Sequence, residues 1–302
     1  MKKEKIGTYR GLVFLFCLFV MWIYLLKIPV ISAQADGNQT LNTTVNITNA
    51  APEVKDIRCP AAVDLEAYGN KTVQCNVTVF DYDNNTNIVN ATFYFNTVAA
   101  EDPDNKLNHY TNSSCVNESP QDNEMNFSCT FDLIYFANNG SWYSNATAYD
   151  DQDASGNNIS DSINVNPLTA IYIPTDTVLD FGELETGQTS GDKEANITNA
   201  GNIQINISVQ GWANTKGDDL AMDCEYGTID RTYEKYAVTS GELFSAMTEL
   251  PLNDEMIAGL FIERQTADGS LKTNTTYWKL EIPPSAGGIC EGKLLFTASA
   301  KE

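Results

Sequence analysis

The chain has 302 residues and carries 40 acidic against 18 basic side chains, which gives a net charge of −22. Proteins that bind nucleic acid neutralise backbone phosphates with Lys and Arg, so this charge excludes nucleic acid as a partner. Strong acidity instead favours solubility, cation binding or repulsion from other anionic surfaces, and the length suffices for two domains with separate cores.

The first 35 residues have the order of a secretory signal peptide. A basic start is followed by the apolar run 12–26 and then by the small-residue motif Ala33-Gln34-Ala35. This order predicts cleavage after Ala35. The apolar run is shorter than the roughly 20 residues that a spanning helix needs, although residues 28–31 would extend it into an uncleaved anchor helix. Residues 1–35 are therefore a signal peptide or a membrane anchor. In both cases the membrane is contacted only by this segment, and the rest of the chain faces outside.

Asn-x-Ser/Thr triplets recur from residue 36 onward. Chance alone predicts roughly five, if about one residue in six is Ser or Thr. The chain has sixteen: Asn38, Asn42, Asn46, Asn70, Asn76, Asn84, Asn90, Asn112, Asn117, Asn126, Asn139, Asn145, Asn158, Asn196, Asn206 and Asn274. The triplet is the N-glycosylation acceptor, and its glycan requires solvated surface outside the cytoplasm. The alternative is that these residues are simply common in polar turns and exposed strand faces. Residues 36–50, which are rich in Asn and Thr, are predicted to be a glycosylated linker.

Cysteine usage is also that of an exported protein. Cys17 lies in the leader, and six cysteines remain: Cys59, Cys75, Cys115, Cys129, Cys224 and Cys290. An even number in an exported chain indicates disulfides, although sequence alone does not fix their connectivity. We prefer the local pairing Cys59–Cys75, Cys115–Cys129 and Cys224–Cys290. A zinc site is the rival interpretation, which the lack of any Cys-x-x-Cys disfavours.

Residues 51–166 are predicted to form a first β-sandwich. Short alternating runs separated by Asn, Asp and Gly turns, with almost no helical periodicity, are typical of this fold. The predicted strands are 73–80, 88–95, 127–131, 142–149 and 159–165. The polar stretch 101–122 is predicted to be a long loop pinned by the disulfide of Cys115.

Residues 168–302 are predicted to form a second β-sandwich, after a boundary at the prolines of 167–174. Two alternating strands, 193–199 and 203–209, flank Ala200-Gly201-Asn202, and a Gly-Asn centre between such runs predicts a hairpin. A short helix is expected at 243–250. Strands at 260–264, 277–282 and 293–298 are expected to close the fold.

Several of these segments resemble known modules. Ala51-Pro52-x-Val54, the turn that ends at Asp81, and Ala148-Tyr149-Asp150…Gly156-Asn157 resemble immunoglobulin-like modules of prokaryotic surface proteins. The second half is similar to sandwich domains with an Asn-x-Gly-Asn strand pair, here 199–202. Together these motifs resemble uncharacterised secreted archaeal surface proteins with tandem immunoglobulin-like domains. Because they are turn and strand signatures, the resemblance implies a fold and no chemistry.

One turn has the residue types of a calcium site. Asp151, Asp153 and Ser155 supply oxygens at alternate positions, and Gly156 follows at the sixth. The twelfth position is Ser162, where a complete calcium-binding loop requires Glu. The alternative is an ordinary acidic turn, in which Asp and Gly serve the backbone geometry. Calcium is thus the one cofactor that the sequence suggests.

Residues for enzymatic chemistry are scarce. Ser-His-Asp and Cys-His sites need a histidine base, and the only histidine, His109, is expected to be a solvated loop residue. Trp142 and Trp278 are assigned to the cores of the two domains. The sequence therefore predicts a non-enzymatic, N-glycosylated extracellular protein, secreted or anchored, with a structural or adhesive role. Its expected partners are other cell-surface proteins or glycans. The alternative is a module that binds carbohydrate or peptide through loops at a sandwich end.

Overall fold

The computed structural model describes residues 40–84, 86–121, 123–174 and 177–301. Residues 48–302 form one compact unit. Within the described ranges, regular structure is almost entirely β, and no helix has the length and apolar character needed to cross a bilayer. The predicted leader, its cleavage site and Asn38 lie outside the described residues.

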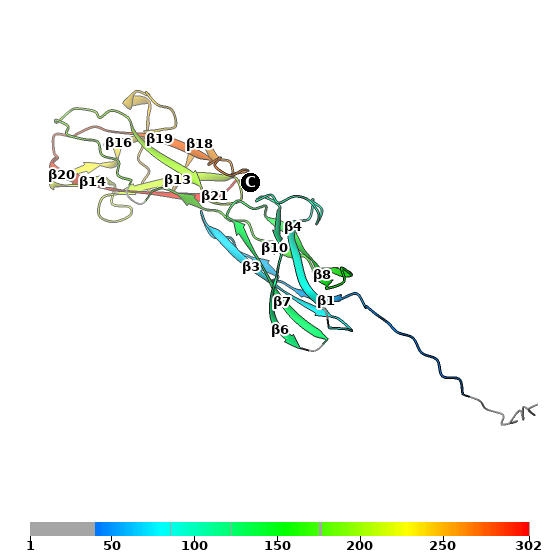
Figure 1. The fold of residues 1–302 in the computed structure, drawn as a ribbon. Coiled ribbons are helices and arrows are strands. Elements are labelled where there is room, and N and C mark those ends of the chain that lie inside the picture. The colour runs from blue at the N-terminus through cyan, green and yellow to red at the C-terminus, as the bar shows by residue number, and fades with distance from the viewer. Residues whose placement is uncertain (1–39, 85, 122, 175–176, 302) are drawn as a thin grey trace, which may run out of the picture. The chain divides into compact units, whose positions relative to one another are not determined.

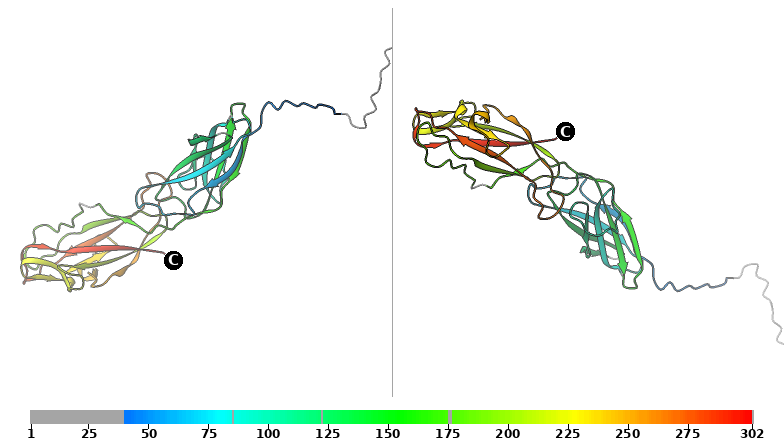
Figure 2. Two further views of the ribbon diagram at one scale, coloured as in Figure 1. Left: turned by 90° about the horizontal axis from the view of Figure 1, so that it is seen from below. Right: turned by 90° about the horizontal axis from the view of Figure 1, so that it is seen from above.

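The first half of the compact unit contains two sheets, seen together in Figures 1 and 2. One sheet has the order β1-β3-β7-β6 and is antiparallel: β1 (Glu53–Arg58), β3 (Asn70–Phe80), β7 (Glu124–Ile134) and β6 (Val116–Gln121). The other has the order β2-β10-β8-β4-β5: β2 (Ala62–Val63), β10 (Ile163–Val165), β8 (Gly140–Asp150), β4 (Thr86–Phe95) and β5 (His109–Asn112). A further strand, β9 (Ser155–Ile159), also pairs with β8. Only β2 and β10 in this sheet pair in parallel.

Both sheets contribute to one hydrophobic core. Alternate residues of β3, such as Val77 and Val79, are fully buried, and they share the core with Phe93 of β4. Successive side chains of a strand point to opposite faces, so one face of β3 packs inward while the other meets solvent. Trp142 is fully buried and stacks on Phe93, with 5.2 Å between the ring centroids. The prediction that Trp142 belongs to this core is confirmed.

The second half of the unit contains three further sets of paired strands. The largest has the order β11-β12-β19-β16-β17: β11 (Ile171–Tyr172), β12 (Lys193–Asn199), β19 (Thr273–Leu280), β16 (Glu234–Ala237) and β17 (Thr248–Glu249). The second has the order β18-β13-β21: β18 (Glu255–Ile262), β13 (Ile205–Trp212) and β21 (Lys293–Ala300). The third has the order β15-β14-β20: β15 (Thr228–Asp230), β14 (Leu220–Tyr226) and β20 (Gly287–Glu291). Two 3₁₀ turns, Arg231–Tyr233 and Phe244–Ala246, lie between these strands.

A second hydrophobic core lies among these strands. Ile197 of β12, Ile205 and Ile207 of β13, and Trp278 of β19 are all fully buried in it. This placement confirms the alternation predicted for β12 and β13, and it confirms Trp278 as a core residue. No strand of the first half pairs with a strand of the second within the described ranges.

The hairpin predicted around Ala200-Gly201-Asn202 is wrong. β12 pairs with β11 and β19, whereas β13 pairs with β18 and β21, so the chain crosses between sheets here. The loop is held by long-range partners. The buried Asn199 amide donates to the Ile203 carbonyl at 2.8 Å, and the Asn202 side-chain oxygen accepts from the Leu168 N–H at 2.6 Å. A Cβ on Gly201 would lie 2.0 Å from the Leu168 carbonyl oxygen, so this close approach requires glycine.

Two further predictions need correction. The stretch 101–122 is not a single loop, because it contains β5 and all of β6. The helix expected at 243–250 is a 3₁₀ turn followed by β17. Leu250 is buried and its N–H donates to the Glu234 carbonyl at 2.9 Å, so the segment joins the sheet edge instead of coiling. β14 and β16 have no counterpart among the predicted strands.

Each of the three disulfides lies at a pair of neighbouring antiparallel strands, although Cys59 directly follows β1 and Cys115 directly precedes β6. The pairs are Cys59–Cys75, Cys115–Cys129 and Cys224–Cys290, the pairing preferred from the sequence. Cys75 and Cys129 are themselves register partners on β3 and β7. The four cysteines of the first two disulfides therefore lie in one row across the sheet. The two disulfides fasten the β1 and β6 edges of the sheet to its central strands, β3 and β7.

The third disulfide closes the longest loop, since 66 residues separate Cys224 from Cys290. In the chain-entropy account, this constraint on the unfolded state is worth about 4 kcal/mol. We expect Cys290→Ser to lower the free energy of unfolding of the second half by roughly that amount and to leave one thiol, at Cys224, that reacts with a thiol reagent. Urea denaturation and thiol titration measure both effects. An unchanged midpoint together with an unreactive Cys224 would show that this pairing is wrong.

Candidate functional site

The fifteen glycan acceptors that the structure describes lie on the outside of the fold. None of them is buried. Ten are exposed: Asn42, Asn46, Asn70, Asn76, Asn84, Asn117, Asn126, Asn139, Asn158 and Asn196. Five are half-buried: Asn90, Asn112, Asn145, Asn206 and Asn274. On the strands, exposed acceptors such as Asn76, Asn126 and Asn196 lie on the face opposite the core residues.

Two acceptors show how a neighbouring strand orients the amide. Thr78 donates its hydroxyl to the side-chain oxygen of Asn126 at 2.9 Å, and Thr275 donates to that of Asn196 at 2.6 Å. In each pair the side-chain amide oxygen of the Asn accepts the hydrogen bond. The nitrogen, which is the atom that a glycan modifies, takes no part in it.

The acidic turn suggested for calcium lies between β8 and β9. Its backbone is organised by the preceding residue, Asp150, which is buried and accepts from the N–H groups of Gln152 and Ala154, both at 2.8 Å. Asn49 donates to the same carboxylate at 2.8 Å. Burial opposes the charge on Asp150, but these donors outweigh it and lower its pKa.

The predicted calcium ligands are all exposed at this turn: Asp151, Asp153 and Ser155. Asp153 adopts a left-handed backbone conformation with a φ of 63°. Within the described residues, no three His, Cys, Asp or Glu side chains form a group suited to a metal ion. The hydrogen bonds to Asp150 account for the shape of the turn, and calcium binding stays a prediction.

His109 is not the solvated loop residue that the sequence suggests. It lies on β5 and is 1% exposed. Its Nδ1 lies 3.1 Å from a carboxylate oxygen of Asp104, and its Nε2 lies 3.0 Å from the Ala100 carbonyl oxygen. Both ring nitrogens therefore have partners, which gives the side chain a structural role in holding the segment before β5.

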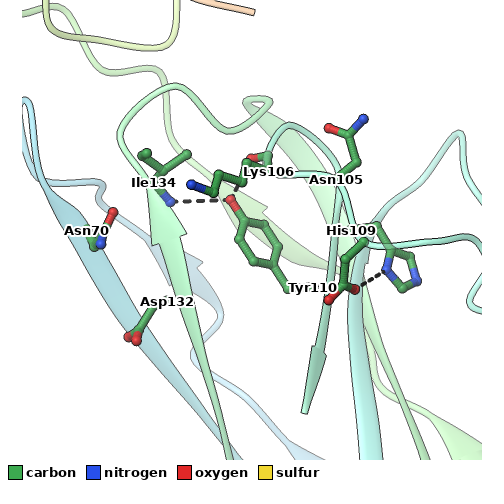
Figure 3. Close-up of a pocket in the computed structure, with 8 residues that line it drawn as sticks. Asn70, Asn105, Lys106, His109, Tyr110, Asp132 and Ile134 are labelled. Carbon is green, nitrogen blue, oxygen red and sulfur yellow. Dashed lines mark hydrogen bonds and ion pairs between the residues drawn. The ribbon is translucent and has the colours of Figure 1, made fainter. Parts of the chain in front are cut away.

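A cavity of about 380 Å³ lies beside His109, and Figure 3 shows most of the residues that line it. Tyr110 crosses it, donating its hydroxyl to the Lys106 carbonyl at 2.5 Å and accepting from the Ile134 N–H at 3.3 Å. Burial is the main cause that raises the pKa of Tyr110. The acceptor Asn70 lies at the same cavity, so a glycan on Asn70 would begin at its edge.

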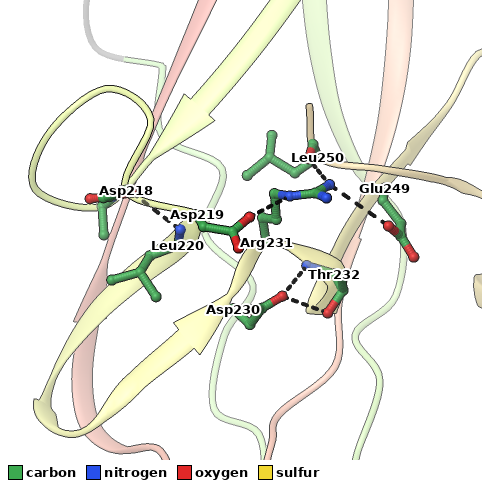
Figure 4. A network of polar contacts seen from close by, with 9 residues as sticks. Asp218, Asp219, Leu220, Asp230, Arg231, Thr232, Glu249 and Leu250 are labelled. Carbon is green, nitrogen blue, oxygen red and sulfur yellow. Dashed lines mark hydrogen bonds and ion pairs between the residues drawn. The ribbon is translucent and has the colours of Figure 1, made fainter. Parts of the chain in front are cut away.

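A second polar cluster links the loops around β14 and β15, as drawn in Figure 4. Arg231 donates to Asp219 at 2.6 Å and to the Leu250 carbonyl at 3.1 Å, and it lies 3.7 Å from Glu249. Burial disfavours the charge of nearby Asp218, yet four backbone N–H donors lower its pKa overall. Asp219 and Glu249 thus interact with Arg231, and Asp218 accepts from backbone N–H groups, so these carboxylates hold the loops together.

One buried carboxyl group has a different environment. Glu234, the first residue of β16, is 3% exposed and lines a cavity of about 440 Å³. No hydrogen bond or ion pair to its carboxyl group is found within the described part of the chain. Desolvation alone raises the pKa of Glu234 to about 8.

Nothing in the local sequence pattern indicates that Glu234 is buried. On β16 a Glu alternates with Tyr236 while Lys235 alternates with Ala237, so both faces of the strand carry one charged residue. Only the pairing of Glu234 with Leu280 on β19 places it on the inner face. This residue is the main feature that sequence reasoning missed.

Comparisons with known proteins give only distant likenesses. No protein-family model matches the chain, and no curated protein matches it significantly. Among solved structures, a chain from a chaperone–tip adhesin complex of CFA/I fimbriae biogenesis has a TM-score of 0.30 at 10% identity, covering 83% of this chain and 84% of that one. The C-terminal domain of the Streptococcus agalactiae AgI/II polypeptide BspA has a TM-score of 0.23 at 7% identity, and the match covers 80% of this chain and 92% of that one. A putative membrane anchored protein of Corynebacterium diphtheriae has a TM-score of 0.22 at 15% identity, and the match covers 83% of this chain and 57% of that one.

The burial of Glu234 predicts a specific dependence of stability on pH. Its pKa of about 8 in the folded state exceeds the ordinary value of 4.5, so the folded chain keeps a proton that the unfolded chain loses in this window. Stability therefore falls as pH rises between these values, by up to about 1.4 kcal/mol per pH unit. Glu234→Gln removes this contribution.

We expect the Gln variant to gain a few kcal/mol over the wild type at about pH 9 and to differ little at about pH 5. Urea denaturation of both proteins at the two pH values measures the difference. Glu291→Gln, a change at an exposed carboxylate, is the matched control and is expected to show no such gain. A constant offset between wild type and Glu234→Gln at both pH values contradicts the prediction.

Proposed function

We propose that this chain is an exported, N-glycosylated cell-surface protein with a structural or adhesive role and no enzymatic activity. In this proposal two tandem immunoglobulin-like sandwiches, 51–166 and 168–302, follow a signal peptide or anchor and a glycosylated linker at 36–50. Its partners are other cell-surface proteins or glycans. The resemblance noted from the sequence favours an archaeal cell surface.

The observation that carries this proposal is the sorting of acceptors from core residues. None of the fifteen described acceptors is buried, although several lie inside strands whose neighbouring residues are fully buried. Asn76, for example, lies between Cys75 and Val77, both of which are 0% exposed. A glycan on Asn76 would therefore extend into solvent and cost no burial.

The three disulfides support the same conclusion independently. All six cysteines outside the leader are paired, and disulfides persist in oxidising compartments outside the cytoplasm. The described residues form two separate cores, and no strand pairing among them joins the two halves, which supports the division into two sandwiches. Sheets fastened by cross-strand disulfides under a dense glycan layer suit a spacer or adhesive module at a protease-rich cell surface.

Proteolysis tests the proposed role of the glycans. The full chain is exported from a host that performs N-glycosylation and from one that does not, and both products are digested with a broad-specificity protease. Because outward glycans shield the exposed backbone, we expect the glycosylated protein to survive several-fold longer, with a mass excess of one glycan for each occupied acceptor. Equal lifetimes and equal masses would contradict the proposal.

A matched pair of variants assigns the effect to a single acceptor. Asn76→Gln removes the acceptor itself and keeps the Thr78 hydroxyl that orients Asn126, so only the Asn76 peptide is expected to lose its glycan mass. Thr130→Ala changes an exposed threonine on the neighbouring strand β7 that belongs to no acceptor, and it is expected to leave every glycopeptide unchanged.

A further inference from the structure

Two cavities share a wall in the second half of the molecule. They measure about 440 and 940 Å³, and the shared wall includes Leu179, Phe181 and Met222. Pockets that bind small molecules are typically about 300–1,000 Å³, mostly apolar and supplied with a few polar groups. Leu294 and Phe296 of β21 complete the apolar lining of the smaller cavity.

Glu234 is a buried acidic residue that lines the smaller cavity. Its carboxyl group has no partner within the described residues and is almost completely removed from solvent. A buried polar group without a hydrogen bond costs roughly 1–3 kcal/mol, so a core position such as this one would ordinarily hold an apolar residue. A ligand that supplies the missing partner would offset this cost.

The surrounding charge determines which ligand fits. Four exposed carboxylates line the two cavities: Asp180, Glu183, Glu185 and Glu291. Lys293 is the single basic residue that lines either cavity in the described part of the chain. With a net charge of −22 on the whole chain, this rim attracts cations and repels anions.

We propose that these cavities bind a small cationic amphiphile, an apolar molecule with one basic amine. The apolar body lies against Phe181, Met222 and Phe296, and the ammonium group pairs with the Glu234 carboxylate. This site is independent of the glycans and of the proposed surface role. It gives the second half of the chain a binding function in addition to a structural one.

Binding of the amine is coupled to release of a proton. Near neutral pH the empty site holds Glu234 as the neutral acid, because burial raises its pKa to about 8. An ammonium ligand favours the carboxylate, so the carboxyl proton leaves for solvent when the ion pair forms. The other titratable groups around the cavities are the four rim carboxylates, Lys293 and, further along β16, the buried Tyr236.

Calorimetric titration of the full-length protein with octylamine, octanol and octanoate tests the proposal. We expect octylamine to bind about tenfold more tightly than octanol at neutral pH, and octanoate to bind more weakly than either. Titrations in two buffers of different ionisation enthalpy are expected to show release of close to one proton per octylamine bound. Octylamine binding no tighter than that of octanol, or without proton release, overturns the proposal.

Variants assign the preference to the buried carboxyl group. Glu234→Gln keeps the size of the side chain and is expected to reduce octylamine affinity about tenfold, to that of octanol, and to abolish proton release. Glu291→Gln removes one of the four rim carboxylates and is expected to weaken octylamine binding much less than Glu234→Gln does, with proton release retained. Glu124→Gln changes an exposed carboxylate that lines neither cavity, and it is expected to alter neither the preference nor the proton release. Met222→Trp fills the shared wall and is expected to weaken octylamine and octanol alike.

The reverse pattern, with the preference lost in Glu291→Gln and kept in Glu234→Gln, shows surface binding and overturns the proposal. Thermal unfolding of each variant confirms that it is folded. If Glu234→Gln does not fold, proton release by the wild-type protein alone decides the question.

Discussion

Alternation along the strands is the constraint on which the rest of this structure depends. Successive residues of a strand face opposite sides, so a strand with one buried face carries two separate sets of residues. On β3 the inner set includes Cys75 and Val77, and the outer set includes Asn76 and Thr78. A slip of one residue would expose the core residues and bury the acceptor, so the hydrophobic core and the acceptors together fix one register.

The disulfides reinforce this register at the strands with fewest neighbours. β1 and β6 lie at the two edges of their sheet, where each pairs with one strand only. Edge strands are the most easily lost part of a sheet and the most open to pairing with other chains. The disulfides of Cys59 and Cys115 fasten these two sides to β3 and β7, the two central strands of the sheet. Glycans on the outer faces would add a further barrier to association through these edges.

The local sequence predicted strands correctly where apolar and polar residues alternate regularly. It did not predict segments whose conformation is determined by contacts with residues far away in the chain. The strands around Val77, Phe93, Ile197 and Trp278 could be predicted because their apolar residues recur with a period of two. The crossover at Asn199–Asn202 could not, because its Gly-Asn turn is typical of hairpins and only the contacts with Leu168 and Ile262 redirect it. His109 and Glu234 were beyond prediction for a related reason. Each is polar and lies among polar neighbours in sequence, and its burial results from strands that pair far along the chain.

The covalent state of the exported protein is the most direct consequence of this arrangement of strands, disulfides and acceptors. Peptide mapping without reduction, combined with mass determination of the glycopeptides, measures that state in a single experiment. We expect three linked pairs, Cys59–Cys75, Cys115–Cys129 and Cys224–Cys290, and glycan mass on outward acceptors such as Asn76, Asn126 and Asn196. Unmodified acceptors with free thiols, or a direct Cys75–Cys129 link between the two central strands, would contradict this expectation.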